Sequence, residues 1–139
     1  MVNSLTINDL DRFNELGKCI KSNFSEVFKL NEILLMDYNF VFGFYDNNKL
    51  IAFIHIIKMY ESVDIVNIVV DKFYRHQGIA TRLINYVIDS FDDVESIILE
   101  VNENNKIAVE CYRNNNFYEI NRRHKYYSDE DAIIMKRDV

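Results

Sequence analysis

The sequence predicts an α/β fold, with helices on both faces of a mixed sheet of about seven strands. Three observations lead to this prediction. Aromatic and β-branched residues flank a polar turn at 46–49, which is typical of a hairpin. An apolar strand at 65–70 passes through a polar turn into an amphipathic helix, and strand and helix patterns then alternate again. With 139 residues, no proline and no low-complexity linker, the chain is expected to form a single domain.

Each element follows from a local signal. Asn8 is expected to cap the first helix with Asp11 as its reciprocal partner, and Ser25 to cap the second. The expected elements are, in order, a strand at 5–7, helices at 8–20 and 25–34, strands at 38–45, 50–60 and 65–70, a helix at 78–91, a strand at 96–101, a helix at 105–114, and antiparallel strands at 117–125 and 132–136.

Composition limits the classes of function. A net charge of −6 and a pI near 5.0 argue against general nucleic-acid binding and suit a cationic substrate. The start of the chain has no signal-peptide pattern, and the longest apolar run, 50–57, is too short to cross a bilayer. Cys19 and Cys111 lack a Cys-x-x-Cys spacing, so we expect a reduced, cytoplasmic protein. No cluster has metal-ligand spacing, no metal is expected, and His55 on an apolar strand is interpreted as a core or groove residue.

The most informative segment is the turn between the strand at 65–70 and the following helix. It carries Arg75-x-x-Gly78-x-Ala80, and Gly78 is the one glycine of three placed at a strand-to-helix turn. A glycine there allows close backbone approach, and the first N–H groups of the helix can bind an anion such as pyrophosphate. The pattern lacks the Gly-x-x-x-x-Gly-Lys of ATP loops and the three glycines of dinucleotide folds. An ordinary strand–turn–helix junction remains the alternative.

A second informative segment begins at the end of the strand at 96–101. Glu100 is expected to be partly desolvated there, which would raise its pKa toward the range of a general base; a solvated strand-end glutamate is the alternative. Tyr112 lies two helical turns after Asn105 and so on the same side of that helix. From spacing alone, Tyr112 fits a core residue and Asn105 a helix cap.

Together these motifs resemble the GNAT N-acetyltransferases, whose acetyl-CoA loop has the pattern Arg/Gln-x-x-Gly-x-Gly/Ala. The order of elements is similar to the whole GNAT fold. The resemblance implies that Glu100 is the general base and Tyr112 the general acid that protonates the CoA thiolate, in direct transfer from acetyl-CoA to an amine within a ternary complex. It also implies a set of residues that contact the cofactor: Ile68, Val69, Val70, Arg75, His76, Gln77, Gly78, Ile79, Ala80, Thr81 and Asn105.

The segments 99–117 and 122–135 resemble the subfamily of RimI-type ribosomal-protein-alanine N-acetyltransferases. This implies a protein N-terminus as the acceptor, with a ribosomal protein as partner, held near Tyr126, Tyr127 and the acidic run 129–131 between the last two strands. Asn116 stands where the family often has glycine, and Asn tolerates a left-handed backbone. The aromatic-proline-tryptophan run of the subfamily is missing at 23–28. A small-molecule amine, a Lys side chain, or a non-catalytic CoA-binding role therefore stay as alternatives.

Overall fold

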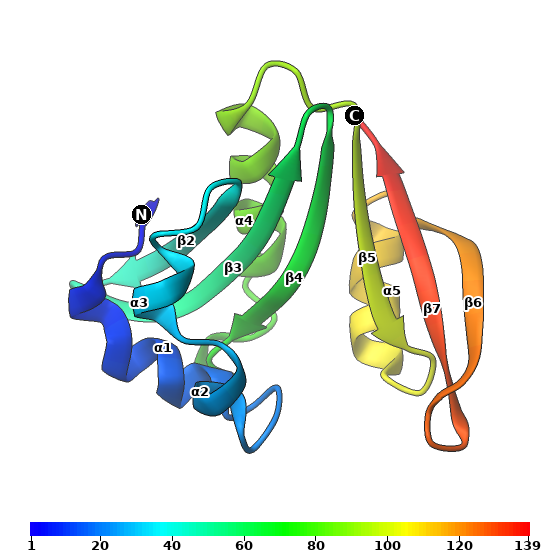
Figure 1. Ribbon diagram of the computed structural model, residues 1–139, viewed down its shortest axis with the longest axis horizontal. Helices are drawn as coiled ribbons and strands as arrows, with labels where there is room; N and C mark the ends of the chain where they lie inside the picture. The colour runs from blue at the N-terminus through cyan, green and yellow to red at the C-terminus, as the bar shows by residue number, and fades with distance from the viewer. The chain divides into compact units, whose positions relative to one another are not determined.

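The computed structural model describes residues 1–139 and has the predicted α/β architecture (Figure 1). Seven strands hydrogen-bond in the order β1-β2-β3-β4-β5-β7-β6; the β4–β5 pair is parallel, whereas β1–β2, β2–β3, β5–β7 and β6–β7 are antiparallel. The sheet is therefore mixed, as predicted. The elements are β1 (Val2–Ser4), η1 (Ile7–Asp9), α1 (Leu10–Gly17), α2 (Phe24–Val27), α3 (Leu30–Ile33), β2 (Asn39–Asp46), β3 (Lys49–Met59), β4 (Ser62–Val70), η2 (Lys72–Tyr74), α4 (Ile79–Ser90), β5 (Ser96–Asn102), α5 (Lys106–Asn114), β6 (Tyr118–Tyr127) and β7 (Glu130–Asp138).

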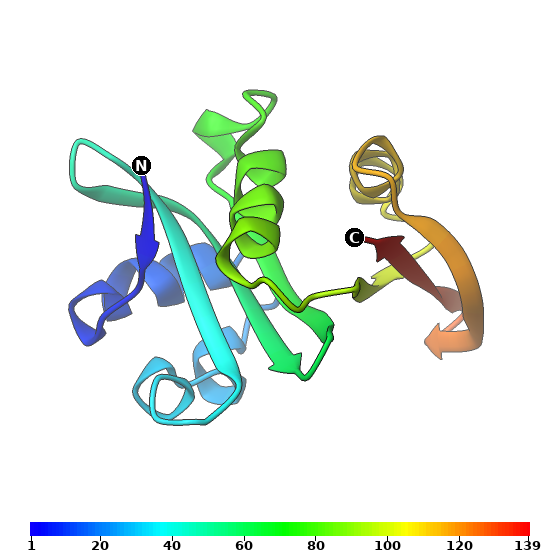
Figure 2. The ribbon, with the colours of Figure 1, turned by 90° about the horizontal axis from the view of Figure 1, so that it is seen from above.

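The chain divides into two compact units, of which the first comprises Met1–Lys58 and Val66–Asp92. In this unit α1, α2 and α3 lie on one face of the strands and α4 lies on the other, as Figures 1 and 2 both show. Side chains of β2 alternate between the two layers. Val41 packs into the cluster under α1–α3, while Phe42 meets the ring of Tyr86 on α4 at 5.1 Å. Burial on both faces explains the almost continuous apolar sequence of β3.

The first turn of the chain differs from the prediction. The first strand is Val2–Ser4 rather than 5–7, and a 3-10 helix occupies Ile7–Asp9. Thr6, not Asn8, is the cap: its hydroxyl accepts from the Asn8 amide, and the Asp9 carboxylate accepts from the Thr6 amide at 2.9 Å. The capping box exists, but two residues earlier than the prediction placed it, and α1 ends at Gly17 instead of 20.

The predicted helix at 25–34 is two short helices. Phe28 and Lys29 have extended backbones between α2 and α3, with ψ of 98° and 107°. The apolar residues that suggested a single helix still reach the core, but from two separate turns: Phe24 from α2, and Leu30 and Ile33 from α3. The break lets both turns bury an aromatic or aliphatic side chain, which a straight helix would direct elsewhere.

The hairpin at 46–49 is confirmed. Asn47 and Asn48 both have left-handed backbones, with φ of 49° and 65°, which is the conformation that tight two-residue hairpins require. None of the helices of the protein is both long and apolar enough to cross a membrane.

The second unit comprises Met59–Ile65 and Asp93–Val139. Helix α5 covers one face of the β5-β7-β6 ladder, seen from above in Figure 2. The strands β6 and β7 extend further than the predicted 117–125 and 132–136. Tyr126 and Tyr127 therefore belong to β6, and Glu130 and Asp131 belong to β7, so these residues do not form the loop that was expected between the last two strands. Only a tight turn at 128–129 separates the strands.

Candidate active site

The turn before α4 has the geometry of an anion cradle. Gly78 caps the helix with a left-handed backbone, φ 75° and ψ 15°, and His76 is left-handed as well, with φ 63°. The first intrahelical bond at this end comes from the Arg82 amide to the Gly78 carbonyl, at 3.0 Å. The amides of residues 79–81 precede it and have no carbonyl partner within the helix. The first turn contains no acidic residue, so nothing there opposes the positive end of the helix dipole.

The role of Gly78 is conformational and spatial. A Cβ atom added at this position would meet no heavy atom within 4 Å. Packing therefore does not require a glycine at this position. The left-handed backbone favours one, and the absence of a side chain keeps the space above the helix terminus open. This combination suits close approach of a phosphate group.

Polar contacts of Asp71 fix the start of the turn. Its Oδ1 accepts from the Phe73 amide at 2.9 Å, and its Oδ2 accepts from Arg12 at 3.1 Å. These hydrogen bonds, first the one from the Phe73 amide, hold the pKa of Asp71 below its ordinary value. Arg75 Nε donates to the Val70 carbonyl at 3.3 Å, so part of this guanidinium ties the end of β4 to the cradle.

The remaining predicted cofactor residues of the first unit lie in β4 and at the start of α4. Val69 is buried in the core cluster under α1–α3, whereas Ile68 and Val70 are half-buried and alternate with it. In α4, Ile79 is buried, Ala80 and Thr81 are half-buried, and the preceding His76 and Gln77 are exposed.

Glu100 lies in β5 of the second unit, where it is partly exposed and has an ion-pair partner. It exposes 30% of its side chain, and its Oε1 pairs with Arg123 Nε at 3.1 Å. Arg123 in turn stacks on the ring of Tyr126 at 5.4 Å. Burial, followed by the charge of Glu100, raises the pKa of the Tyr127 phenol. The structure thus surrounds Glu100 with partners on β6 that sequence reasoning did not find.

Glu100 also lines a hollow of about 240 Å³. All of its walls come from the second unit: Asp64, Ile65, Ile98, Leu99, Glu100, Arg123 and Ile134. Two carboxylates and one guanidinium stand among aliphatic side chains. Asp64 was missed because its proximity to Glu100 depends on the pairing of β4 with β5, which no local pattern encodes.

Tyr112 and Asn105 lie in and before α5. Tyr112 packs edge-on against Phe117 with ring centroids 5.8 Å apart, and burial raises its pKa, so its phenol stays protonated at neutral pH. Asn105 is the helix cap that its position suggested: its Oδ1 accepts from the Ala108 amide at 3.3 Å. Asn116 has the left-handed backbone expected from its place before Phe117, with φ 68°.

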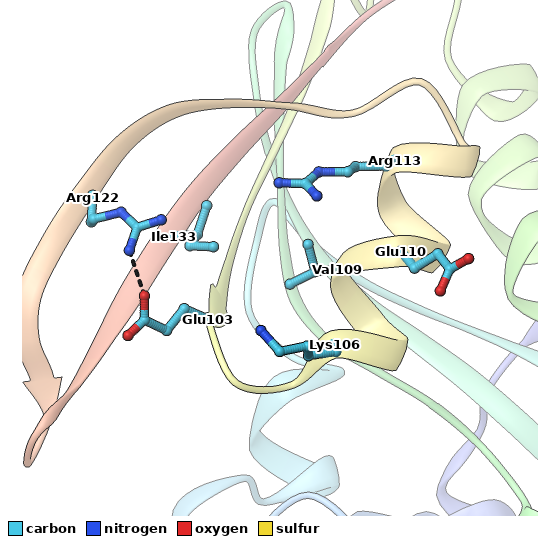
Figure 3. A pocket seen from close by; sticks show the side chains of 7 residues that line it. All are labelled: Glu103, Lys106, Val109, Glu110, Arg113, Arg122 and Ile133. Atoms are coloured by element: carbon cyan, nitrogen blue, oxygen red, sulfur yellow. Dashed lines mark hydrogen bonds and ion pairs between the residues drawn. The ribbon is translucent and has the colours of Figure 1, made fainter.

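A larger hollow of about 370 Å³ lies between α5 and strands β6 and β7, and it contains none of the predicted catalytic or cofactor residues (Figure 3). Lys106 and Arg113 extend from α5 beside Val109, and Arg122 stands opposite (Figure 3). Arg122 forms ion pairs with three carboxylates: Glu103, Asp131 at 3.1 Å and Glu119 at 3.2 Å. This network ties the hairpin to the loop before α5.

His55 is confirmed as a core residue. It is 3% exposed, its Nε2 lies 2.8 Å from Asn39 Oδ1, and burial lowers its pKa to about 4. No group of three or more His, Cys, Asp or Glu side chains is arranged to hold a metal ion.

Comparison with known proteins identifies the family. The model of the acetyltransferase (GNAT) family matches residues 9–117, which is more than half of the chain. The chain belongs to the GNAT family. A curated relative, the [ribosomal protein bS18]-alanine N-acetyltransferase of Escherichia coli K12, is 34% identical over 95 residues. The match spans 64% of this chain and 64% of that relative's length, slightly under two thirds.

Solved structures agree with this assignment. The crystal structure of the ribosomal-protein-S18-alanine N-acetyltransferase from E. coli superposes with a TM-score of 0.80 at 25% identity, over all of this chain and 93% of the other. A putative streptothricin acetyltransferase from Bacillus anthracis, solved in complex with acetyl coenzyme A, has a TM-score of 0.85 at 25% identity, over all of this chain and 98% of the other. The predicted GNAT fold is therefore confirmed.

Proposed function

We propose that residues 1–139 act as one GNAT domain that transfers the acetyl group of acetyl-CoA to a primary amine. The observation that carries this proposal is the cradle at Gly78: a left-handed glycine, open space above it, and a helix terminus without acidic residues. Family membership and the acetyl-CoA complex of a structurally similar relative support the same ligand. A cytoplasmic location belongs to the same proposal.

In this proposal the cofactor is held mainly by backbone groups. Residues 75–81 hold the pyrophosphate, and the amides of residues 79–81 are the donors that the helix terminus leaves available to an anion. The backbone of Ile68, Val69 and Val70 holds the acetyl and pantetheine portion, and Asn105 adds a contact from its amide group. Since the Asn105 Oδ1 already accepts from Ala108, its NH₂ is the part left for the ligand.

Glu100 takes the proton from the incoming ammonium, directly or through water, because an amine must lose that proton before it can attack a thioester. The ammonium N–H bond breaks and the proton passes to a Glu100 carboxylate oxygen. The amine nitrogen then forms the new bond to the acetyl carbon as the carbon–sulfur bond breaks. Tyr112 donates its phenolic proton to the departing thiolate. The nitrogen of the new amide then loses its second proton, and solvent passes a proton back to the Tyr112 phenolate, so that the amide and the phenol both end neutral. A raised pKa keeps that proton on Tyr112 until the thiolate forms.

We propose the α-amino group of a protein N-terminus as the acceptor, with a ribosomal protein beginning in Ala as the first choice. The named activity of the E. coli relative supports this choice, as does the acidic net charge of the chain, which suits a cationic segment. On β6, Tyr127 lies near Glu100 and Tyr126 contacts Arg123, the ion-pair partner of Glu100; both rings offer aromatic surfaces to a peptide.

The test is a mass-spectrometric panel. Peptides with free N-terminal Ala, Ser or Met, the same peptides blocked at the N-terminus but carrying Lys, and simple polyamines are incubated with the protein and acetyl-CoA. We expect acetylation of the free N-termini and no product from the blocked peptides. Product from Lys side chains or polyamines alone would reject the N-terminal acceptor while leaving the acetyltransferase activity in place.

A small-molecule amine or a Lys side chain is the second candidate acceptor. It is favoured by the sequence at 23–28, which lacks the aromatic-proline-tryptophan run, and by the structural similarity to a putative streptothricin acetyltransferase. A protein that binds acetyl-CoA in calorimetry yet acetylates none of these amines would instead be a non-catalytic CoA-binding relative.

A further inference from the structure

We propose that Asp64 is the residue that binds the ammonium group of the acceptor, in the hollow that it shares with Glu100. The inference rests on the proposed function: if Glu100 receives the proton, the ammonium must come within hydrogen-bond distance of Glu100. The hollow beside Glu100 is then the amine subsite, and its second carboxylate takes part in holding the cation.

Sheet register places the two carboxylates on the same face. In the parallel β4–β5 pair, Asp64 stands opposite Ile98, and Glu100 follows Ile98 by two residues, so all three side chains point to one side. The Cα atoms of Asp64 and Glu100 are then about 8 Å apart, from strand spacing and rise. Side chains of these lengths can contact one small cation from two sides. Both residues line the same hollow of about 240 Å³.

The charges of the hollow are unequal before the substrate binds. Glu100 is already paired with Arg123, whereas Asp64 has no cationic partner within ion-pair distance. Lys136 of β7 stands opposite Ile98 and so lies on the same face, and it pairs with Asp138 at 3.6 Å. The hollow itself therefore carries one uncompensated negative charge, which a primary ammonium would neutralise.

Asp64 also balances charge after proton transfer. When the ammonium gives its proton to Glu100, that carboxyl becomes neutral and Arg123 loses its counterion. Asp64, in the same hollow, is then the carboxylate that compensates the guanidinium. The site stays neutral on both sides of the transfer, so no uncompensated charge is created as the amine becomes reactive.

The walls define the group that fits beside the cation. Ile98 and Ile134 line the hollow beside the two carboxylates. Asp64 is an exposed residue, yet partial desolvation still raises its pKa above its ordinary value. A carboxylate without a cationic partner is stabilised by an ammonium group, and the alkyl carbon that carries this ammonium, such as the Cα of an N-terminal residue, can contact the aliphatic side chains of the hollow.

The test uses the full chain and a peptide with a free N-terminal Ala as the probe. Asp64→Asn removes the charge at nearly constant size, Asp64→Glu keeps the charge, and Asp89→Asn removes a carboxylate from the exposed end of α4 as the matched control. We expect Asp64→Asn to raise the KM for the peptide at least 10-fold with a smaller change in kcat, and Asp64→Glu to recover most of the loss. The KM for acetyl-CoA and the melting temperature should not change, which separates binding of the amine from a structural role.

Calorimetric titration of the peptide, without acetyl-CoA, provides a readout that needs no turnover. Asp64→Asn should weaken peptide binding at least 10-fold, and Asp89→Asn should leave it unchanged. Equal affinity in the Asp64→Asn variant and the wild type, or an equal loss in the Asp89→Asn control, would overturn the inference. If the wild type forms no acetylated product, the proposed function fails, while the calorimetric comparison still decides whether Asp64 holds the ammonium.

Discussion

Replacing Gly78 with Ala separates the conformational role of the cradle from its role in binding. The residue has φ 75°, which costs a non-glycine residue about 1 kcal/mol, at the low end of the range for the left-handed region. The added Cβ meets nothing within 4 Å, so no steric term is added. For a chain of 139 residues, a loss of about 1 kcal/mol lowers the melting temperature by about 3–4 °C.

The same methyl group occupies the space into which a phosphate would enter. We therefore expect acetyl-CoA affinity to fall by at least 10-fold, which is about 1.4 kcal/mol, measured by calorimetry at 25 °C, where the variant is still folded. Gly78→Asn is the matching variant: Asn tolerates the left-handed backbone, so stability should largely return while affinity stays low.

Gly17→Ala is the opposite control. A Cβ there would lie 2.0 Å from the Phe24 ring, which is fully buried, so overpacking should cost more stability than Gly78→Ala and leave cofactor affinity intact. Wild-type acetyl-CoA affinity in Gly78→Ala would refute the cradle. Full recovery of affinity in Gly78→Asn would show that strain, and not occupied space, weakens binding.

Three further predictions concern catalysis and folding. Glu100→Gln should lower kcat by ~10²- to 10⁴-fold with unchanged acetyl-CoA affinity. Tyr112→Phe should lower kcat at little cost in melting temperature. If both variants keep the wild-type kcat, the assignments of the general base and the general acid are wrong. Thr6→Ala should cost about 1 kcal/mol in urea unfolding through loss of the capping box, whereas Asn8→Ala should be nearly neutral. The pKa of His55 is lowered to about 4 in the folded protein, so on acidification the unfolded chain takes up this proton first. The free energy of unfolding should therefore fall by roughly 3 kcal/mol between pH 6.5 and pH 4, and His55→Leu should flatten this pH dependence.

Local signals were enough for most of the fold. The asparagines at 47–48 predicted the hairpin because their left-handed tolerance is a property of the residue itself, and Gly78 predicted the turn before α4 for the same reason. The boundaries that failed depend on competition between neighbouring signals. Thr6 and Asn8 can both cap a helix, and tertiary packing of the first turn selects Thr6.

The candidate site was predictable only where its residues are consecutive. The cradle at 75–81 is such a segment, whereas Glu100 and Tyr112 were assigned through their resemblance to a family pattern. Asp64 and Arg123 were not found, because strand pairing and register bring them to the hollow of Glu100, from 36 residues before it and 23 after it. Register is a long-range property, and one residue of slip would have moved either side chain to the other face.

The break at Phe28–Lys29 has a consequence for local opening. Two helices of four residues each cannot persist by themselves, so α2 and α3 depend on the packing of Phe24, Leu30 and Ile33 under them. Amide hydrogens of this segment should exchange with solvent through small, frequent openings that leave the strands of β2 and β3 protected. Substitutions at the exposed positions between residues 24 and 33 can accordingly reshape one surface of the protein at little cost to the sheet, whereas Phe24, Leu30 and Ile33 must keep their packing.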